Sequence, residues 1–498
     1  MRSRVIAGAL LSSFLLLFSA GFIHGGPARQ GPQWAPPENL SNSPTVVSRY
    51  PDIAVDGLGH VHVVWVEAEM ENGQEVASAI YYAMNDGQAW TTPVDIVFGQ
   101  WMLLPNITVD ASGVIHVVYI QGGSLMYTQA AAWNAPWSAR NWRKPVALFA
   151  YVGEGFGARW PEIQVDSNGT LHLVYTNLGT VNYRRSDDGG LTWSEPVAIP
   201  PDGRGATIEF STSNRLAINR QGLLFAAWGE EPVAPTSTEP SQLYFSRSTD
   251  GGRTWAEPTH ISGSLGVKRL FEPVVLIVDG EDRLHLVWRE NEQGTLRLWH
   301  RWSEDQGNSW SADQPFCVEG AERYGGIAAE VDSLGRVHFV YSTGGFIYHV
   351  MMDHQRCTPP ARISEAILMG PPYWPKLAIG LGNQAHVVWT SGFPELALYD
   401  LDERLQSGDY EIRYSSVTLE APALEPRPFE MEPTPSPTSS PSPTAIPLTS
   451  TPMESTVPPS IPMEPEVRTS SWAVWLGPLA ALVTVLLAVI VRQVTRPR

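Results

Sequence analysis

Acidic side chains recur at one position of a repeated sequence pattern, two residues after the aromatic residue that ends an apolar stretch. This position is polar in every copy, and its residues are Glu67, Gln121, Asn177, Glu230, Glu290, Thr343 and Ser391. Paired carboxyl groups can act as general acid and base, so Glu67, Glu230 and Glu290 are candidate catalytic residues. A strand end that meets water is also polar, and this second interpretation stays open.

Two arginines precede an aromatic–proline pair in the similar segments "SRYPDI" and "ARWPEI". They are Arg49 and Arg159, and each stands two residues before the proline. A planar guanidinium can hold a carboxylate through two parallel hydrogen bonds, so both arginines are candidate ligand-binding residues. Trp160, Tyr373 and Trp374 stand at similar places in their repeats and would add aromatic contacts if the fold brings them together.

An aspartate-rich motif with tryptophan occurs at 186–197 ("SDDGGLTWSEPV"), 248–259 ("STDGGRTWAEPT") and 303–315 ("SEDQGNSWSADQP"). A metal loop or an acid site could show such a composition. The copies lie on different repeats, however, so their aspartates are too far apart to share a substrate or an ion. Asp can accept backbone N–H bonds within a tight turn, Gly allows the turn's backbone angles, and Trp packs between strands. We interpret the motif as structural.

Histidines also recur in register, and they raise the question of a metal. They are His62, His116, His172, His285, His338 and His386, with Phe225 in the remaining copy. Repeat symmetry separates them by whole units, and phenylalanine fits the same place. We therefore expect packed, hydrogen-bonded strand histidines, no metal ligand set and no cofactor.

These residues belong to a unit that recurs seven times between residues 34 and 419. "YPDIAVDGLGHVHVVWVE" (50–67) and "WPEIQVDSNGTLHLVYTN" (160–177) show its first half, a strand, an Asp/Gly turn and a second strand rich in Val and aromatic residues. The position of Asp56 recurs at 110, 166, 219, 279, 332 and 380. A period near 50 residues that is made of short strands indicates a propeller or a solenoid.

The second half of each unit carries two further strands, the last of them marked by a Trp-x-x-Pro motif. The seventh unit lacks this strand, whereas "WAPPENL" (34–40) precedes the first unit and fits the motif. The N-terminal strand would therefore complete the last blade, and the closed ring would leave no free sheet edge. The sequence predicts an all-β, seven-bladed β-propeller of four-stranded blades.

The segment Ser186-x-Asp188-x-Gly190-x-Thr192-Trp193 resembles the Asp-box, S-x-D-x-G-x-[ST]-W, of the sialidase-like (BNR repeat) β-propeller superfamily. The segments 248–255 and 303–310 match it fully, 83–90 is a degraded copy, and the resemblance covers residues 34–419. It implies a propeller, with the six-bladed sialidase ring as an alternative. It also implies a ligand site on the face where the first strand of each blade begins.

The resemblance further implies three arginines that bind the sialic acid carboxylate, an aspartic acid/base, and a tyrosine nucleophile activated by a glutamate. Arg49 matches the arginine of the family's Arg-Ile-Pro motif in spacing, although Tyr50 replaces Ile. The other candidates are Arg269, Arg289 and Arg323 for the arginines, and Tyr324 or Tyr373 for the nucleophile. Three hypotheses follow: recognition of a glycan or protein at the central funnel without turnover, exo-sialidase-like hydrolysis, or a structural cell-surface module.

The two ends of the chain predict its location. Residues 1–26 have the pattern of a signal peptide, and residues 472–491 form an uncharged apolar run followed by a basic tail at 492–498. Residues 420–470 are rich in Pro, Ser and Thr and predict a disordered stalk. We expect a single-pass protein of the cell membrane with its N-terminal domain outside.

The net charge of −18 argues against a nucleic-acid partner, because phosphates require a basic surface. Cys317 and Cys357 are the two cysteines. They fall on outer strands of successive blades at different heights, so the sequence predicts that they are not bridged. We expect a monomer.

Overall fold

The computed structural model describes residues 32–43, 45–71, 74–153, 157–177, 179–199, 208–232, 241–265, 275–292, 295–317, 324–353, 356–364, 373–392 and 410–429. The predicted signal peptide, most of the stalk, the apolar run and the basic tail lie outside these residues. No helix in the described ranges has the length and apolar character needed to cross a membrane.

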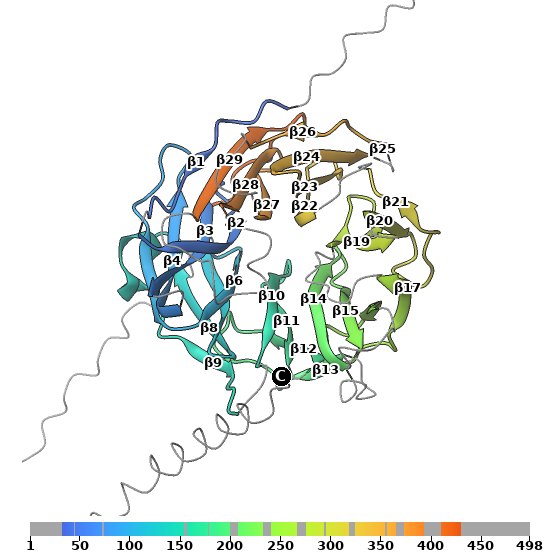
Figure 1. Cartoon of the computed structure of the whole chain (residues 1–498), viewed down its shortest axis with the longest axis horizontal. Coiled ribbons are helices and arrows are strands. Elements are labelled where there is room, and N and C mark those ends of the chain that lie inside the picture. The colour runs from blue at the N-terminus through green and yellow to red at the C-terminus, as the bar shows by residue number, and fades with distance from the viewer. Residues whose placement is uncertain are drawn as a thin grey trace, which may run out of the picture. The chain divides into compact units, whose positions relative to one another are not determined.

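Seven antiparallel sheets surround a central channel, so the seven-bladed prediction is confirmed and the six-bladed alternative is wrong (Figure 1). The innermost strands are β2 (Val47–Val55), β6 (Met102–Val109), β10 (Arg159–Val165), β14 (Ile208–Ile218), β18 (Val275–Val278), β22 (Tyr324–Val331) and β27 (Tyr373–Gly380). The second strands are β3 (Val61–Glu71), β7 (Val114–Gln121), β11 (Leu171–Asn177), β15 (Leu224–Pro232), β19 (Leu284–Glu292), β23 (Val337–Thr343) and β28 (Gln384–Ser391).

The outer half of each blade holds the remaining strands. The third strands are β4 (Gln74–Asn85), β8 (Ser124–Ala131), β12 (Thr180–Ser186), β16 (Ser241–Ser248), β20 (Thr295–Ser303), β24 (Phe346–Asp353) and β29 (Glu411–Thr418). The outermost strands are β5 (Val94–Gly99), β9 (Val146–Phe149), β13 (Val197–Ile199), β17 (Thr259–Leu265), β21 (Gln314–Pro315), β25 (Arg356–Cys357) with β26 (Ala361–Arg362), and β1 (Glu38–Asn39). We number the blades 1 to 7 in the order of their innermost strands.

The ring closes as the sequence predicts. Strand β1 pairs with β29, with Glu38 opposite Tyr414 and Asn39 opposite Arg413, and the two strands lie side by side in Figure 1. The N–H of Ala35 also donates to Ser416 at 2.9 Å, and that of Leu40 donates to Ile412 at 2.8 Å. The N-terminal segment therefore completes blade 7.

A chain of polar and aromatic contacts fixes each blade and joins it to the next. In blade 1, Asp56 Oδ1 accepts the N–H groups of its own turn, and Oδ2 lies 3.3 Å from His62 Nε2. His62 Nδ1 shares a 2.8 Å hydrogen bond with the Tyr82 hydroxyl. Trp142 of blade 2 then packs edge-on against Tyr82, with ring centroids 5.1 Å apart. The histidines are buried and hydrogen-bonded, which confirms the structural interpretation.

The same edge-on contact recurs at six of the seven blade interfaces, with centroid distances of 4.8–5.4 Å and interplanar angles of 62–81°. The pairs are Trp142–Tyr82, Trp193–Tyr127, Trp255–Tyr183, Trp310–Phe245, Trp34–His349 and Trp90–Tyr414. We call this contact the tryptophan clasp. Each of the seven interfaces also encloses its own cluster of buried apolar side chains, so the core is divided between neighbouring blades.

The remaining interface, between blades 5 and 6, is joined by a disulfide between Cys317 and Cys357, so the prediction of unbridged cysteines is wrong. Cys357 occupies the sequence position that tryptophan holds in the other blades, and its Cα lies 5.7 Å from that of Cys317. Sheet twist rotates each outer strand away from the inner one, so positions at different heights along their own blades meet at the interface. A covalent bond here replaces the tryptophan clasp.

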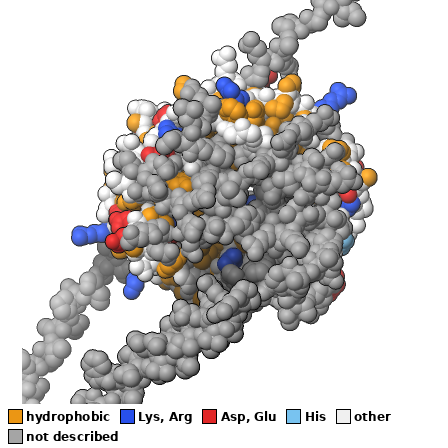
Figure 2. Space-filling view, in the orientation of Figure 1, with side chains coloured by type: hydrophobic (Ala, Val, Ile, Leu, Met, Phe, Trp, Pro, Cys, Tyr) orange, Lys and Arg blue, Asp and Glu red, His pale blue; other side chains and the backbone are white. Residues whose placement is uncertain are grey.

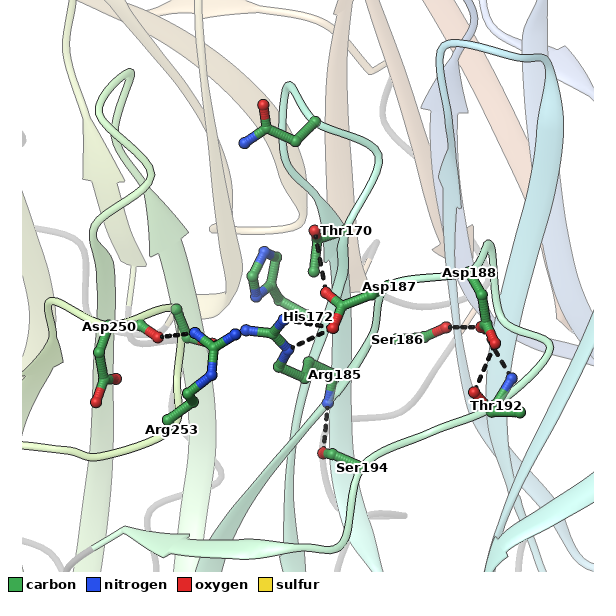
Figure 3. Close-up of polar contacts among 12 residues, drawn as sticks. Thr170, His172, Arg185, Ser186, Asp187, Asp188, Thr192, Ser194, Asp250 and Arg253 are labelled. Carbon is green, nitrogen blue, oxygen red and sulfur yellow. Dashed lines mark hydrogen bonds and ion pairs between the residues drawn. The ribbon is translucent and has the colours of Figure 1, made fainter.

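The Asp-boxes are turns, as interpreted from the sequence (Figure 3). Asp188 Oδ1 accepts from the Ser186 hydroxyl at 2.8 Å and from the N–H of Thr192 at 2.9 Å, while the Thr192 hydroxyl donates to Oδ2. These bonds, led by those from Thr192, lower the pKa of Asp188 to about 2. The carboxylate is thus occupied within its own loop.

The folded unit extends beyond the predicted boundary at residue 419. Residues 420–429, which we call the strap, cross the turns between the first and second strands of blades 6, 7, 1 and 2. Arg336 Nη2 donates to Glu420 O at 2.8 Å, Leu424 N to Leu381 O at 2.8 Å, and Arg427 N to Gly57 O at 2.7 Å. Phe429 then packs against the cluster between blades 1 and 2. The first ten residues assigned to the stalk therefore belong to the propeller.

Two adjacent glycines of one Asp-box allow a matched test of the interface. Both have positive φ, +66° at Gly189 and +83° at Gly190, but a Cβ at Gly189 meets nothing within 4 Å, whereas one at Gly190 would lie 1.8 Å from the Tyr127 hydroxyl. We expect Gly189→Ala to cost about 1 kcal/mol of unfolding free energy and Gly190→Ala at least about 3 kcal/mol. Denaturant unfolding measures both, and equal losses would contradict the tight packing of the box against blade 2.

Candidate binding site at the mouth of the central channel

The seven innermost strands enclose a central cavity of about 600 Å³. All seven run in the same direction along it. We call the end where they begin the entry face, and the end that carries the Asp-boxes the Asp-box face. On the face shown in Figure 2, described basic and acidic side chains lie near one another at the rim, without one extended field of either sign.

Three aromatic residues and a leucine lie at the entry end of the cavity, each at the same place in its blade. They are Tyr50, Leu104, Trp160 and Trp374, and all four line the cavity. Their φ angles are +55°, +52°, +50° and +49°, and each lies where the register between the first two strands shifts. A bulky residue before proline rarely adopts this conformation, which costs on the order of 1–3 kcal/mol. Such strain at one mouth favours a functional role for these side chains.

These four residues come from consecutive blades, 7, 1, 2 and 3, so they form an arc. The rings of Tyr50 and Trp374 lie 4.4 Å apart between centroids. All three aromatic side chains are half-buried, which leaves part of each ring open to the cavity. We call Tyr50, Trp160 and Trp374 the aromatic arc.

Tyr50 lies among charged groups. Arg49 packs over its ring at 5.2 Å and forms an ion pair with Glu75, with both side chains almost fully buried. Burial raises the pKa of Tyr50, opposed by Arg49 and Arg159, and burial lowers the pKa of Arg159, opposed by Tyr50. Arg159 directly precedes Trp160 of the arc in β10, and its positive charge acts on the Tyr50 hydroxyl.

A layer of polar residues lies deeper in the channel. Asp52 bonds Asn106 Nδ2 at 2.6 Å and Ile107 N at 2.9 Å on blade 2, and Lys376 Nζ of blade 7 at 2.9 Å. Between blades 3 and 4, Arg215 Nη1 lies 3.4 Å from Glu162 Oε2. These hydrogen bonds and ion pairs join blades 7, 1 and 2, and blades 3 and 4, below the arc.

Glu330 is the exception among the acidic residues that line the cavity. Asp52 and Glu162 each have a basic partner, whereas the hydrogen bond described for the Glu330 carboxylate comes from the N–H of Val331 at 3.1 Å. Burial, opposed by that bond, raises the pKa of Glu330 to about 7. A carboxyl that changes charge near neutral pH therefore lines the channel.

The predicted catalytic carboxylates lie elsewhere. The indole of Trp65 donates to Glu67 at 3.0 Å, and that of Trp228 donates to Glu230 at 2.9 Å. Glu67 also accepts from the Ser43 hydroxyl at 2.6 Å, and burial raises its pKa. Neither carboxylate is among the residues that line the cavity.

Several predicted residues have only their backbone described. Arg289 and Glu290 lie in β19, Tyr324 in β22 and Tyr373 in β27, and their side chains are outside the described part. Arg269 and Arg323 lie outside it altogether. Their roles stay predictions, as do those of Arg49, Arg159, Trp160 and Trp374. Among the residues that the structure describes, no group of three or more His, Cys, Asp or Glu side chains could hold a metal ion.

Sequence reasoning missed Tyr50, Asp52 and Glu330 as site residues. Tyr50 was visible in "SRYPDI", where it precedes the proline as Trp160 does in "ARWPEI". Glu330 stands two residues before Asp332, a place where the other repeats carry Ala54, Thr108, Gln164, Ala217, Ile277 and Ala378. A carboxylate that breaks a repeat pattern was therefore an available signal.

Comparison with known families identifies the chain. The model of the BNR repeat-like domain matches residues 59–344. The chain belongs to this family. The match confirms the predicted membership of the sialidase-like BNR propeller superfamily. No curated protein matches this BNR repeat-like propeller.

Solved structures of propellers are similar to this BNR repeat-like chain. A protein of unknown function from Dyadobacter fermentans shares 13% identity, with 78% of this chain and 100% of that chain covered and a TM-score of 0.48. An ulvan lyase of polysaccharide lyase family PL25 shares 12%, with 78% and 97% covered and a TM-score of 0.49. The intramolecular trans-sialidase from Ruminococcus gnavus shares 10%, with 81% and 100% covered and a TM-score of 0.43.

Because the pKa of Glu330 is raised, the unfolding free energy of this BNR repeat-like propeller should depend on pH. Replacing Glu330 should remove that part of the dependence. The unfolded carboxyl ionises near pH 4.5 and the folded one near 7, so burial costs stability that develops as the pH rises between these values. We expect Glu330→Gln to unfold like the parent at pH 4 and to be about 3 kcal/mol more stable at pH 8.

Denaturant unfolding at a series of pH values measures this difference, and Glu195→Gln, at an exposed site, is the control. A Glu330→Gln advantage that is the same at pH 4 and pH 8 would contradict the raised pKa.

Proposed function

We propose that this protein is a membrane-anchored, extracellular propeller that binds an anionic glycan at the entry face of its channel. The observation that carries the proposal is the aromatic arc, in which three rings from blades 7, 1 and 3 line one mouth in strained backbone conformations. Flat apolar faces of sugars stack on such rings, and fixed side chains lose little entropy on binding.

The charges beside the arc favour an acidic sugar. Arg159 directly precedes Trp160 of the arc and its charge acts on Tyr50, and Lys376 lies in the layer below with Asp52. A guanidinium at the edge of an aromatic platform can hold a carboxylate or sulfate while the ring stacks on the sugar. Arg49 would position Tyr50 and would not bind the sugar itself, because a buried ion pair with Glu75 holds the Arg49 guanidinium against the Tyr50 ring.

Recognition without turnover is favoured over hydrolysis. Tyr50 lies beside Arg49 at the mouth, and burial raises its pKa, whereas a nucleophile requires activation. Glu75 is committed to Arg49, and Glu67 and Glu230 are bonded by their own strands' tryptophans. Exo-sialidase-like hydrolysis remains the alternative. In that case the side chains of Glu290, Tyr324 and Tyr373 would supply the catalytic groups.

The membrane anchor in this proposal is the apolar run at 472–491, with residues 1–26 as the signal peptide. The strap supports the orientation of the domain. It lies on the Asp-box face, and the apolar run follows it in the sequence, so we expect the entry face to point away from the membrane.

A panel of neutral, uronic, sulfated and sialylated oligosaccharides tests the proposal by calorimetry with residues 32–432. We expect an acidic member to bind, and Trp160→Ala and Trp374→Ala each to weaken binding about tenfold or more, because loss of ring stacking costs about 1.4 kcal/mol. Trp137→Ala is the matched control, since Trp137 is 71% exposed and lies far from the channel, in the loop between β8 and β9.

Cleavage of a fluorogenic sialoside that is lost in Tyr324→Phe or Tyr373→Phe would instead establish the hydrolase. Binding unchanged by both arc variants would overturn the assignment of the site. Absence of binding across the panel would leave the structural module as the better account.

A further inference from the structure

Blade 2 carries an aromatic and basic loop where other blades carry an Asp-box. Residues 132–145 join β8 to β9 and contain two short 3-10 helices, η1 (Ala135–Trp137) and η2 (Ala139–Asn141). Trp133 and Trp137 are 63% and 71% exposed, among the most exposed large hydrophobic side chains described. We call residues 132–145 the blade-2 loop.

The exposed indoles are held in place. The Trp137 indole donates to Trp133 O at 3.1 Å, and the Ser138 hydroxyl accepts from Arg140 N at 3.2 Å. The base of the loop is anchored by Trp142, which is buried and clasps Tyr82 of blade 1. The loop therefore presents two indoles to solvent on a fixed support, which packing alone does not explain.

The charge of the loop is opposite to that of the chain. Arg140, Arg143 and Lys144 are exposed, and among the described residues no carboxylate lies within ion-pair distance of them. No Asp or Glu stands between Asp110 and Glu154 in a chain whose net charge is −18. The blade-2 loop thus carries three exposed cations together with two exposed indoles in a chain of negative net charge.

The position of the loop indicates what it faces. Phe429, the last described residue of the strap, packs on Gly113, and the carbonyl of Gly113 accepts the N–H of Ala132 at 2.8 Å. The last described residue of the strap therefore lies at the base of the blade-2 loop, on the Asp-box face, and the apolar run at 472–491 follows it in the sequence.

We propose that the blade-2 loop docks on the phospholipid surface of the membrane in which the protein is anchored. Indoles favour the membrane–water interface, and exposed Arg and Lys bind lipid phosphates and anionic headgroups. The inference rests on the anchor in the proposed function but not on the glycan site. An acidic polysaccharide offers similar charge, but the strap ends beside the loop and the apolar run follows it in the sequence, which favours the bilayer.

Tethering makes even a weak contact sufficient. Residues 430–471 separate the strap from the apolar run in the sequence, so the loop and the proposed anchor belong to one chain. Tethering makes the contact of the loop with the membrane an intramolecular step, so the loop needs only modest affinity to hold the propeller on the surface. The entry face would then be held away from the bilayer.

Vesicle flotation with residues 32–432 tests the proposal without the anchor. This fragment is suitable because residues up to Glu432 form one compact unit, and near-UV circular dichroism checks its fold. We expect binding to phosphatidylcholine vesicles with 30% phosphatidylglycerol, weaker binding to phosphatidylcholine alone, and a decrease with salt. Trp133→Ser with Trp137→Ser, and Arg140→Glu with Lys144→Glu, should each lower the partition coefficient at least tenfold.

One matched control changes exposed aromatic residues on the opposite face, and the other reverses exposed charges outside the blade-2 loop. Phe98→Ser with Trp101→Ser removes 72% and 52% exposed aromatic side chains at the entry side of blade 1, and Arg220→Glu with Arg356→Glu reverses two exposed charges. Both controls should keep vesicle binding, and the loop variants should keep any glycan binding measured at the channel. Equal flotation of loop variants and parent, or no flotation of either, would overturn the proposal. Binding to a heparin column without vesicle binding would overturn it in favour of a polysaccharide.

Discussion

The propeller depends on one contact repeated around the ring, in which a tryptophan of one blade packs edge-on against an aromatic ring of the blade before it. That ring, Tyr82 in blade 1, is held by His62, and His62 is held by Asp56, which also closes the turn between the two inner strands. Local turn geometry is therefore coupled to the packing between blades. Where the tryptophan is absent, at Cys357, a disulfide takes the same place, which shows how strongly this position must be fixed.

These contacts place stronger packing constraints on one end of the propeller than on the other. The Asp-box face holds the bonded turns, the strap and the glycines that touch the preceding blade, and these glycines tolerate little change of volume. At the entry face the inner strands begin with residues of quite different character, from Tyr50 to Gly326, because no clasp fixes them. A rigid ring can therefore support a mouth whose chemistry differs from blade to blade.

The repeat period, the aspartate turns and the Trp-x-x-Pro motif were sufficient to predict the number of blades, the closure by the segment at Trp34 and the structural role of the Asp-boxes. These features are local or periodic, and a sequence displays both directly. The Cys317–Cys357 bond was not predicted. The sequence places the two cysteines at different heights in their own blades, but the twist of the sheets brings these positions together at the interface. The strap resembled the stalk in composition, since its contacts are mostly backbone hydrogen bonds that side-chain types do not reveal. Glu67 and Glu230 were visible, but their tryptophan partners two residues earlier became evident only in space.

The asymmetry of the channel follows from the same logic. Blades 7, 1, 2, 3 and 4 place charged or amide side chains at one level, Lys376, Asp52, Asn106, Glu162 and Arg215, and these bond across the blade interfaces. Blades 5 and 6 place Val275 and Ala328 at that level, so this side of the channel has no polar lock and instead carries Glu330 two residues farther along. The aromatic arc stands above the polar side. A ligand that entered there would meet stacking surfaces and cations on one wall, and on the other a carboxyl whose charge changes near neutral pH, so binding of an anion would weaken as the pH rises through that range.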